Sequence, residues 1–213
     1  MKPIILSAWI AGVLAVCAAP ARAQSLGQFG GAEVVPVNGQ AFGAYVDASA
    51  HVVGVISQLR LSFYPKVDFG FQGGLDRLDY LDVNRTVVRL GTDFKVLTAK
   101  AGPTFPVDLA FGAGLAVETG DNVSVLTVGP MGVVSRSFPA GAGGTIVPYG
   151  ALGISYSSID VPGRDDTGLQ LPLKLGTEFR FAPELRFVVE LQQKMGTSYS
   201  DKGSFAIGAT FPF

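Results

Sequence analysis

The sequence GSFAIGATFPF at positions 203–213 alternates between two kinds of side chain. Counted back from the end, one set is apolar (Phe213, Phe211, Ala209, Ile207 and Phe205), and the residues between them are small or polar. A period of two is typical of a β-strand whose two faces meet different surroundings. Aromatic side chains on a terminal strand would promote aggregation in water, whereas lipid would accommodate them. The stretch therefore predicts a strand in the wall of a membrane-spanning barrel.

This strand resembles the C-terminal signal of bacterial outer-membrane β-barrel proteins, and the residues that carry the match are Phe205, Ile207, Phe211 and Phe213. In that family the signal is read by the barrel-assembly machinery, so the resemblance implies this machinery as a partner. Nearly all of the mature chain is similar in pattern to the small OmpA/OmpX-like barrels. The resemblance implies a place in the outer membrane among lipid and lipopolysaccharide, and a structural, adhesive or surface-interaction role with no specified extracellular partner.

The first 23 residues have the pattern of a secretory signal peptide. Lys2 precedes an apolar run at positions 4–19, and Ala21 and Ala23 form an Ala-x-Ala cleavage site. We therefore expect residues 1–23 to be removed and residues 24–213 to form one barrel domain without an appended peptidoglycan-binding module. The alternative is a lipoprotein signal at Cys17, from which the preceding Val16 departs. Cleavage after Ala23 leaves no thiol for a disulfide or a metal site.

Charge and apolarity together favour a membrane barrel. Removing Lys2 and Arg22 leaves 14 basic residues (16 minus 2) against 17 acidic ones, which argues against nucleic acid as a partner. Hydrophobic residues make up 48% of the chain and charged residues 15%, well below the roughly 25% charge of soluble domains. The apolar residues are dispersed, with no long unbroken run in the mature chain. This dispersal is typical of transmembrane β-strands.

Alternation continues through the body of the chain and predicts an all-β, antiparallel up-and-down barrel of about ten strands. It is clear in four segments, 85–97, 105–118, 169–181 and 184–195. It is weaker in 123–138 and 145–158, where Pro130 and Pro148 each remove a ladder donor. The first strand is either 32–37 or 41–47. Eight strands are the alternative, if the region 30–47 is a plug or linker.

The connections fall into two alternating classes. One class is flanked by large aromatic residues, at positions 65–66, 100–103, 141–144 and 182–183, and the C-terminus lies at the same end. The other class is polar and often acidic, at 47–50, 79–84, 119–122, 160–167 and 196–202. An aromatic band marks a membrane interface. We therefore expect the aromatic turns to be periplasmic and the acidic loops to be extracellular.

If the apolar face meets lipid, the charged face lines the lumen. The predicted lumen residues are Arg60, Asp68, Arg89, Asp93, Asp108, Glu118, Lys174, Glu178, Arg180, Arg186, Glu190 and Lys194, together with Asp76, Arg85, Lys95 and Glu184. Isolated charges in a narrow interior would be costly, so we expect ion-pair networks. The favoured interpretation is a lumen that these networks plug, and the alternative is a narrow channel for ions or small solutes.

Other functions are disfavoured by the side chains present. A less favoured alternative is a lipid- or peptide-cleaving barrel enzyme, for which His51, the single histidine, would be the general base beside Asp47 and Ser49. We expect His51 to be solvated instead. Asp160, Asp165 and Asp166 fit no defined calcium loop. No catalytic residue, metal ligand or cofactor is therefore predicted. The remaining alternative is a soluble periplasmic barrel with its apolar face inward and a ligand inside, and it leaves the aromatic turns and the terminal Phe unexplained.

Overall fold

The computed structural model describes residues 29–49, 52–80, 83–120, 123–141, 143–161, 164–196 and 203–213. These residues form twelve strands: β1 (Gln40–Ala48), β2 (Val52–Tyr64), β3 (Val67–Tyr80), β4 (Val83–Ala99), β5 (Asp108–Gly120), β6 (Val123–Ser135), β7 (Phe138–Ala140), β8 (Gly144–Gly153), β9 (Ser155–Val161), β10 (Arg164–Ala182), β11 (Leu185–Gly196) and β12 (Gly203–Pro212). Within these ranges there is no helix that is long and apolar enough to span a membrane.

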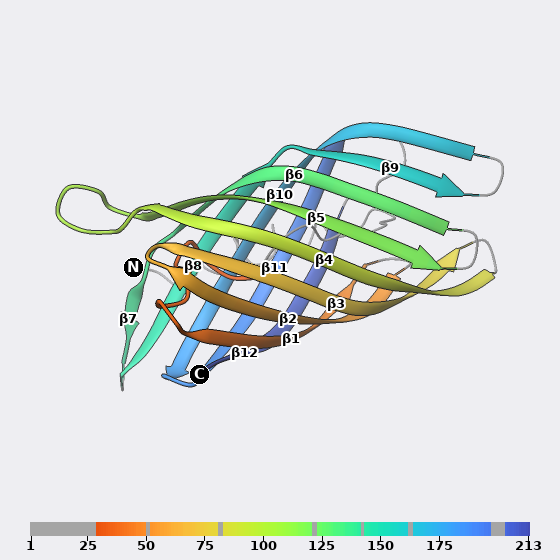
Figure 1. The fold of residues 1–213 in the computed structure, drawn as a ribbon. Coiled ribbons are helices and arrows are strands. Elements are labelled where there is room, and N and C mark those ends of the chain that lie inside the picture. Colours follow the sequence, from red (N-terminus) through yellow and green to blue (C-terminus); the bar gives the residue numbers. More distant parts are fainter. Residues whose placement is uncertain are drawn as a thin grey trace, which may run out of the picture.

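The strands close into one antiparallel ring of ten positions (Figure 1). β8 and β9 share one position, because β6 and β10 pair with both of them in turn. β7 is a short hairpin partner of β8. The ring closes between β1 and β12, where Gln40 and Phe213 exchange backbone hydrogen bonds of 3.0 and 2.9 Å. The predicted ten-stranded up-and-down barrel is confirmed, and the eight-stranded alternative is wrong.

The wall is interrupted at one level, between β8 and β9, although the register of pairing with β6 and β10 is the same on both sides of the interruption. Ile154 separates β8 from β9 and donates its backbone N–H to the carbonyl of Pro130 at 3.1 Å. On the other side, the pairing of β10 moves from β9 to β8 around Pro172. Proline cannot donate to a ladder, so Pro130 and Pro172 both lie where donors are not needed. The strands predicted at 123–138 and 145–158 therefore exist, and the second of them is broken.

The hairpins at one end of the barrel are longer than the sequence predicts. Ladder pairing continues to Tyr80 and Val83 in the β3–β4 hairpin, and to Val161 and Arg164 in the β9–β10 hairpin. The segments expected as loops at 79–84 and 160–167 thus belong largely to strands, because the ladder is made by backbone groups, which polar residues supply as well as apolar ones. At the other end, the strand expected from Phe105 begins at Asp108 instead.

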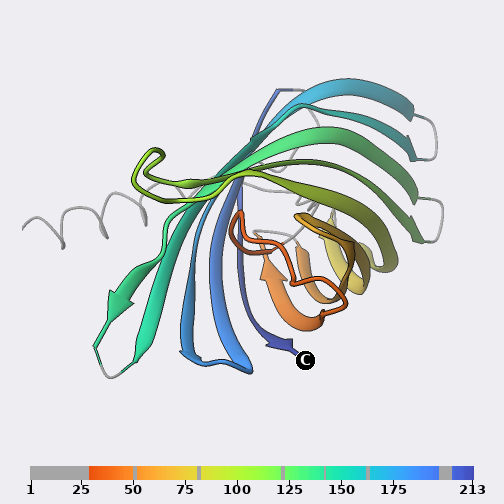
Figure 2. The same ribbon diagram turned by 60° about the vertical axis from the view of Figure 1, so that its left-hand side comes forward.

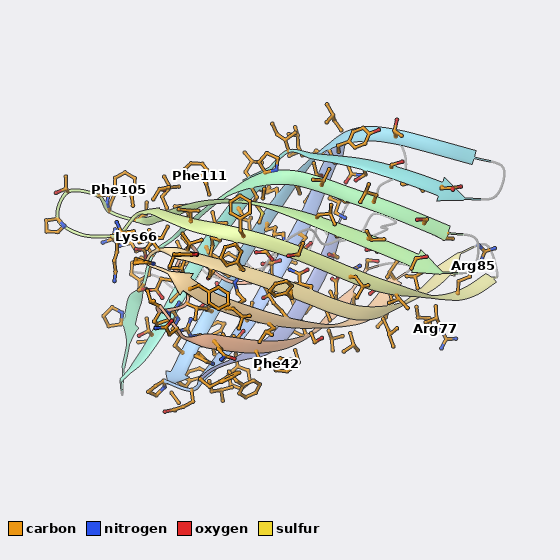
Figure 3. All side chains as sticks on the ribbon, in the orientation of Figure 1. Phe42, Lys66, Arg77, Arg85, Phe105 and Phe111 are labelled. Atoms are coloured by element: carbon orange, nitrogen blue, oxygen red, sulfur yellow. The ribbon has the colours of Figure 1, made fainter. Side chains whose placement is uncertain are left out.

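The outer and inner faces of the wall have opposite chemistry. Large apolar side chains are exposed around the outside, among them Val55, Leu75, Leu90, Phe111 and Leu175, each more than half exposed. Phe42 and Phe111 point away from the barrel (Figure 3). The side chains between them point inward, and many of these are charged and buried. Such an inverted distribution fits a barrel whose outer surface meets lipid, and it is the reverse of a soluble ligand-binding barrel.

Candidate functional site

The space enclosed by the strands contains a stretch of the chain itself. Residues 29–37, which we call the plug segment, precede β1 and lie inside the ring (Figure 2). Phe29, Gly30, Gly31 and Ala32 are buried, whereas Val37 is 44% exposed at the end of the barrel that carries the C-terminus. The stretch 32–37, one of the two candidates for the first strand, is therefore not a strand. The sequence offered a plug only with eight strands, whereas the structure combines a plug with ten.

The main chain of the plug segment is held by side chains of the wall. The backbone N–H of Gly31 donates to Glu178 Oε1 at 2.5 Å, that of Ala32 to Ser135 Oγ at 3.0 Å, and that of Val35 to Asp68 Oδ2 at 3.1 Å. In the opposite sense, Lys95 Nζ donates to the carbonyls of Gly31, at 3.0 Å, and Glu33. These partners lie on β3, β4, β6 and β10, so the segment is anchored across the lumen.

Side-chain contacts fix the two ends of the buried part. Phe29 stacks on Tyr45 of β1 with ring centroids 4.3 Å apart, and Lys174 Nζ lies 5.5 Å from the centroid of the Phe29 ring. Ala32 is fully buried against Ala110, Val133 and other small or flexible side chains of β5, β6 and β8. Around Ala32 the lumen is thus lined by small apolar side chains. On the side of β2–β4 and β10–β11 it is lined by charged side chains.

One ion-pair network lies beside the plug segment. Arg60 Nη2 contacts Asp68 Oδ1 at 2.5 Å and Asp93 Oδ1 at 2.8 Å, and Gln72 Nε2 donates to Asp93 at 3.2 Å. On β10, Arg180 pairs with Glu178 at 2.8 Å and with Glu33 of the plug segment at 2.5 Å. Asp68 and Glu178 therefore each bind both a cation of the wall and the main chain of the plug segment.

A second network, centred on Arg89, lies toward the other end of the barrel. Arg89 is 1% exposed, and it contacts Glu118 Oε1 at 2.9 Å and Asp76 Oδ2 at 2.8 Å. Asp47 lies farther from it, with 3.8 Å between the nearest charged atoms. One guanidinium therefore faces three buried carboxylates from three different strands. Such an arrangement stabilises only while the cation is present.

A third group joins β8, β10 and β11. Tyr149 donates its hydroxyl to Glu190 Oε2 at 2.6 Å, and Lys174 Nζ lies 3.6 Å from Glu190 Oε1. Nearby, Lys194 is 6% exposed, and its Nζ has no hydrogen-bond partner among the described residues. Around it, the carboxylate oxygens of Asp47 and the hydroxyl of Ser204 are likewise buried without hydrogen bonds from the described protein groups.

Most of the predicted lumen residues lie in the charged interior of the barrel. Ten of the twelve are buried, and Arg180 and Arg186 are partly buried near the C-terminal end. Glu184 was predicted to point inward, but it lies exposed in the turn between β10 and β11, where the pairing shifts register after Arg180. Asp108 accepts from the N–H of Ala101 at 2.8 Å and orders the β4–β5 connection rather than a lumen network.

The sequence missed several residues that build the site. Asp47 was assigned to an outer loop, yet it is the buried inward residue near the end of β1. Phe29, Glu33 and Tyr45 are not among the predicted site residues. Tyr149 is expected in the aromatic band beside the turn at 141–144, but it is buried in the lumen. Tyr45 and Tyr149 alternate in phase with the inward-facing residues of their strands, so the alternation could have identified them. The contacts of Phe29 and Glu33 depend on how the chain enters the lumen, for which alternation gives no signal.

Aromatic residues gather at the end of the barrel that carries the C-terminus. Phe181 and Phe187, from opposite sides of the β10–β11 turn, have ring centroids 6.2 Å apart, and Phe63 and Phe69 are 6.3 Å apart across the β2–β3 turn. Phe211 and Phe213 are exposed in the same region, at 44% and 71%. Phe205 and Ile207 share this outward face farther along β12. Lys66 and Phe105 lie at this end, and Arg77 and Arg85 at the other (Figure 3).

Some predicted residues lie outside the described part of the chain. They are Ala21 and Ala23 of the cleavage site, Cys17 and His51. Within the described ranges, no group of three or more His, Cys, Asp or Glu side chains is arranged to hold a metal ion.

Comparison with known proteins identifies the fold. No protein-family model matches the chain, and no curated protein matches it by sequence. The β-domain of the Bordetella autotransporter BrkA is 11% identical, with 82% of this chain and 98% of that one covered and a TM-score of 0.50. The N-terminal barrel of Pseudomonas aeruginosa OprF (10% identity, 83% and 98% covered) gives 0.38, and an outer-membrane channel of Pseudomonas putida F1 (11%, 88% and 100%) gives 0.47. Together with the closed ring and the apolar exterior, the likeness to the BrkA β-domain shows that the chain has the fold of a bacterial outer-membrane β-barrel.

Proposed function

We propose that the protein is a closed outer-membrane barrel with a structural or surface-interaction role. The observation that carries the proposal is the occupied lumen, in which the plug segment and the networks of Arg60 and Arg89 fill the interior. An eight-stranded barrel is just wide enough for side chains to fill, and diameter grows with strand number. A ring of ten positions is therefore wider than its side chains alone would fill, and the plug segment occupies the excess.

Conductance measurements test this proposal. The purified, folded protein in planar bilayers is expected to show no steady conductance in buffer, because the plug segment and the buried ion pairs occupy the lumen. Folding is checked by faster migration of the unboiled sample on SDS gels. A matched porin preparation serves as the positive control. Regular single-channel steps from the unmodified protein would contradict the proposal.

A narrow channel is the second candidate, and one observation favours it. Lys194 Nζ, both carboxylate oxygens of Asp47 and Ser204 Oγ are buried without hydrogen-bond partners among the described residues. Buried polar groups in proteins are nearly always satisfied, often by ordered water. Water among these groups would make the half of the lumen farthest from the C-terminus a hydrated chamber. This chamber would become a conduction path only if the half of the lumen that contains the plug segment also opened.

We also propose that the C-terminal strand is read by the barrel-assembly machinery and that the exposed apolar belt contacts outer-membrane lipid and lipopolysaccharide. Phe213 supports the first part, because its side chain is 71% exposed while its backbone closes the ring with Gln40. Replacing Phe213 by Asp is expected to lower the amount of folded barrel in the outer membrane several-fold. Replacing it by Tyr should leave the amount near that of the unmodified chain.

The measurement is the heat-modifiable fraction in outer-membrane preparations, normalised to total expression. Refolding of both variants into detergent separates assembly from stability, since a signal role predicts that the Asp variant refolds in vitro. Equal amounts of both variants in the membrane would show that Phe213 carries no assembly signal.

A further inference from the structure

The plug segment differs from the wall in how it is held. Most of its hydrogen bonds described above run between its main chain and the wall side chains of Glu178, Ser135, Asp68 and Lys95, and its side chain Glu33 adds an ion pair with Arg180. Water and ions replace such bonds one by one, whereas the closed ladder of the wall opens only cooperatively. The apolar anchorage is small and consists mainly of Phe29 on Tyr45 and of Ala32 in its pocket. The segment can therefore detach at a lower free energy than the barrel unfolds.

The segment is joined to the wall by a tight turn at the rim. The N–H of Gly39 donates to the carbonyl of Pro36 at 2.8 Å, and Asn38 between them has φ 62°, a conformation that Asn tolerates well. Asn38 also donates its N–H to Ser62 of β2 at 2.8 Å, so the turn is fixed to the wall. Within this turn, Pro36 and Val37 are exposed. The rim is thus a fixed pivot, and residues 29–35 form a short arm that begins there.

We propose that the plug segment is a detachable gate, which leaves the lumen through the C-terminal end of the barrel about the turn at Pro36–Gly39 and so converts the closed barrel into a pore for small polar solutes. This inference rests on the proposed closed barrel. The opened passage is lined by Arg60, Lys95, Asp68 and Glu178, which carry both signs of charge. The pore therefore discriminates by size more than by charge.

A disulfide between the gate and the wall tests the proposal in the full-length chain. A Cβ placed on Gly31 lies 3.1 Å from Ser135 Cβ. Disulfides need Cβ atoms about 3.5–4.5 Å apart, so the pair Gly31→Cys and Ser135→Cys requires a shift of a few tenths of an ångström. Cys17 is the single cysteine of the sequence and lies in the predicted signal peptide, so competing pairs are few. The single-cysteine variants are the matched controls.

Conductance is recorded in planar bilayers during a urea titration, at urea concentrations where unboiled gel mobility shows the barrel intact. We expect the reduced pair to conduct and the oxidised pair to remain closed. The fraction of open barrels should be roughly ten- to hundredfold higher for the reduced pair than for the oxidised pair. Hydrogen bonds to charged groups hold the gate closed, and their free energy corresponds to a factor of this size. Equal conductance of the two forms, or silence of both, would overturn the gate. Conductance of the unmodified protein in plain buffer would instead overturn the proposed closed barrel.

A second variant keeps the test independent of the disulfide. A Cβ on Gly31 already lies 3.2 Å from Glu178 Oε1, so the two methyl groups that valine adds beyond this Cβ crowd the seat, and Gly31→Val should conduct at a lower urea concentration than the unmodified protein. Val55→Thr is the control, because Val55 is 59% exposed on the outer face of β2 and lies outside the gate and its turn. A folded Gly31→Val variant that stays as silent as Val55→Thr would contradict the gate.

Discussion

Replacing Arg89 by Met is expected to destabilise the folded barrel by about 3–5 kcal/mol, the usual cost of leaving buried carboxylates without their cation. Arg89 is 1% exposed and lies within 3 Å of both Asp76 and Glu118, which are themselves buried. Methionine fills much of the same volume but compensates no charge. The loss is expected to appear as a lower urea midpoint for unfolding from detergent micelles.

Two further variants separate charge from packing. Adding Asp76→Asn and Glu118→Gln to Arg89→Met neutralises the two nearest of the three carboxylates that Arg89 faces, and it should recover a large part of the lost stability. Arg77→Ala removes an exposed cation on the outer face of β3, and it should cost less than about 1 kcal/mol. If Arg89→Met and Arg77→Ala shift the midpoint equally, the network around Arg89 does not stabilise the barrel.

Replacing Gly129 by Ala is expected to cost about 3 kcal/mol or more, because the added methyl group collides with backbone that cannot move aside. A Cβ at this position would lie 2.0 Å from the carbonyl oxygen of Ile154 and 2.7 Å from Ser155 Cα. These atoms are at the junction of β8 and β9, where the wall is already interrupted. Moving them would break the pairing on both sides of the junction.

Gly150 provides the same substitution in an ordinary setting. Its added Cβ would meet Leu175 Cδ2 at 3.6 Å, a normal van der Waals contact, so Gly150→Ala should leave the urea midpoint nearly unchanged. Both variants are compared by refolding yield and by the unboiled mobility shift. Equal refolding yields would mean that the backbone at the junction of β8 and β9 adjusts easily and that the close approach at Gly129 is unimportant.

The wall of the barrel was predictable from sequence because alternation is a local signal. Inward charges such as Arg89 and Glu190 are flanked on both sides by apolar residues that need lipid, so the two faces sort themselves residue by residue. The exact strand ends were less predictable. Polar residues such as Asp160 and Asp165 pair at the end of the β9–β10 hairpin as readily as they would occupy a loop.

The contents of the lumen were predictable only in part. Charges that face inward need partners, so the existence of ion-pair networks was predictable. The identity of the partners depends on the tilt and stagger of ten strands. Glu33 meets Arg180 across 147 residues of sequence, and no local pattern encodes that contact. Asp47 shows the same limit, because the end of a strand and the start of a loop look alike in sequence.

The plug segment also has a mechanical consequence. It is bonded to Asp68 and Lys95 on one side of the ring, and to Ser135 and Glu178 on the other. A hollow tube flattens easily under lateral pressure from the surrounding bilayer, whereas a tube with an internal cross-brace resists becoming elliptical. Residues 29–35 form such a brace. The stiffness of this barrel against squeezing therefore depends on a few side-chain bonds inside it as well as on its wall.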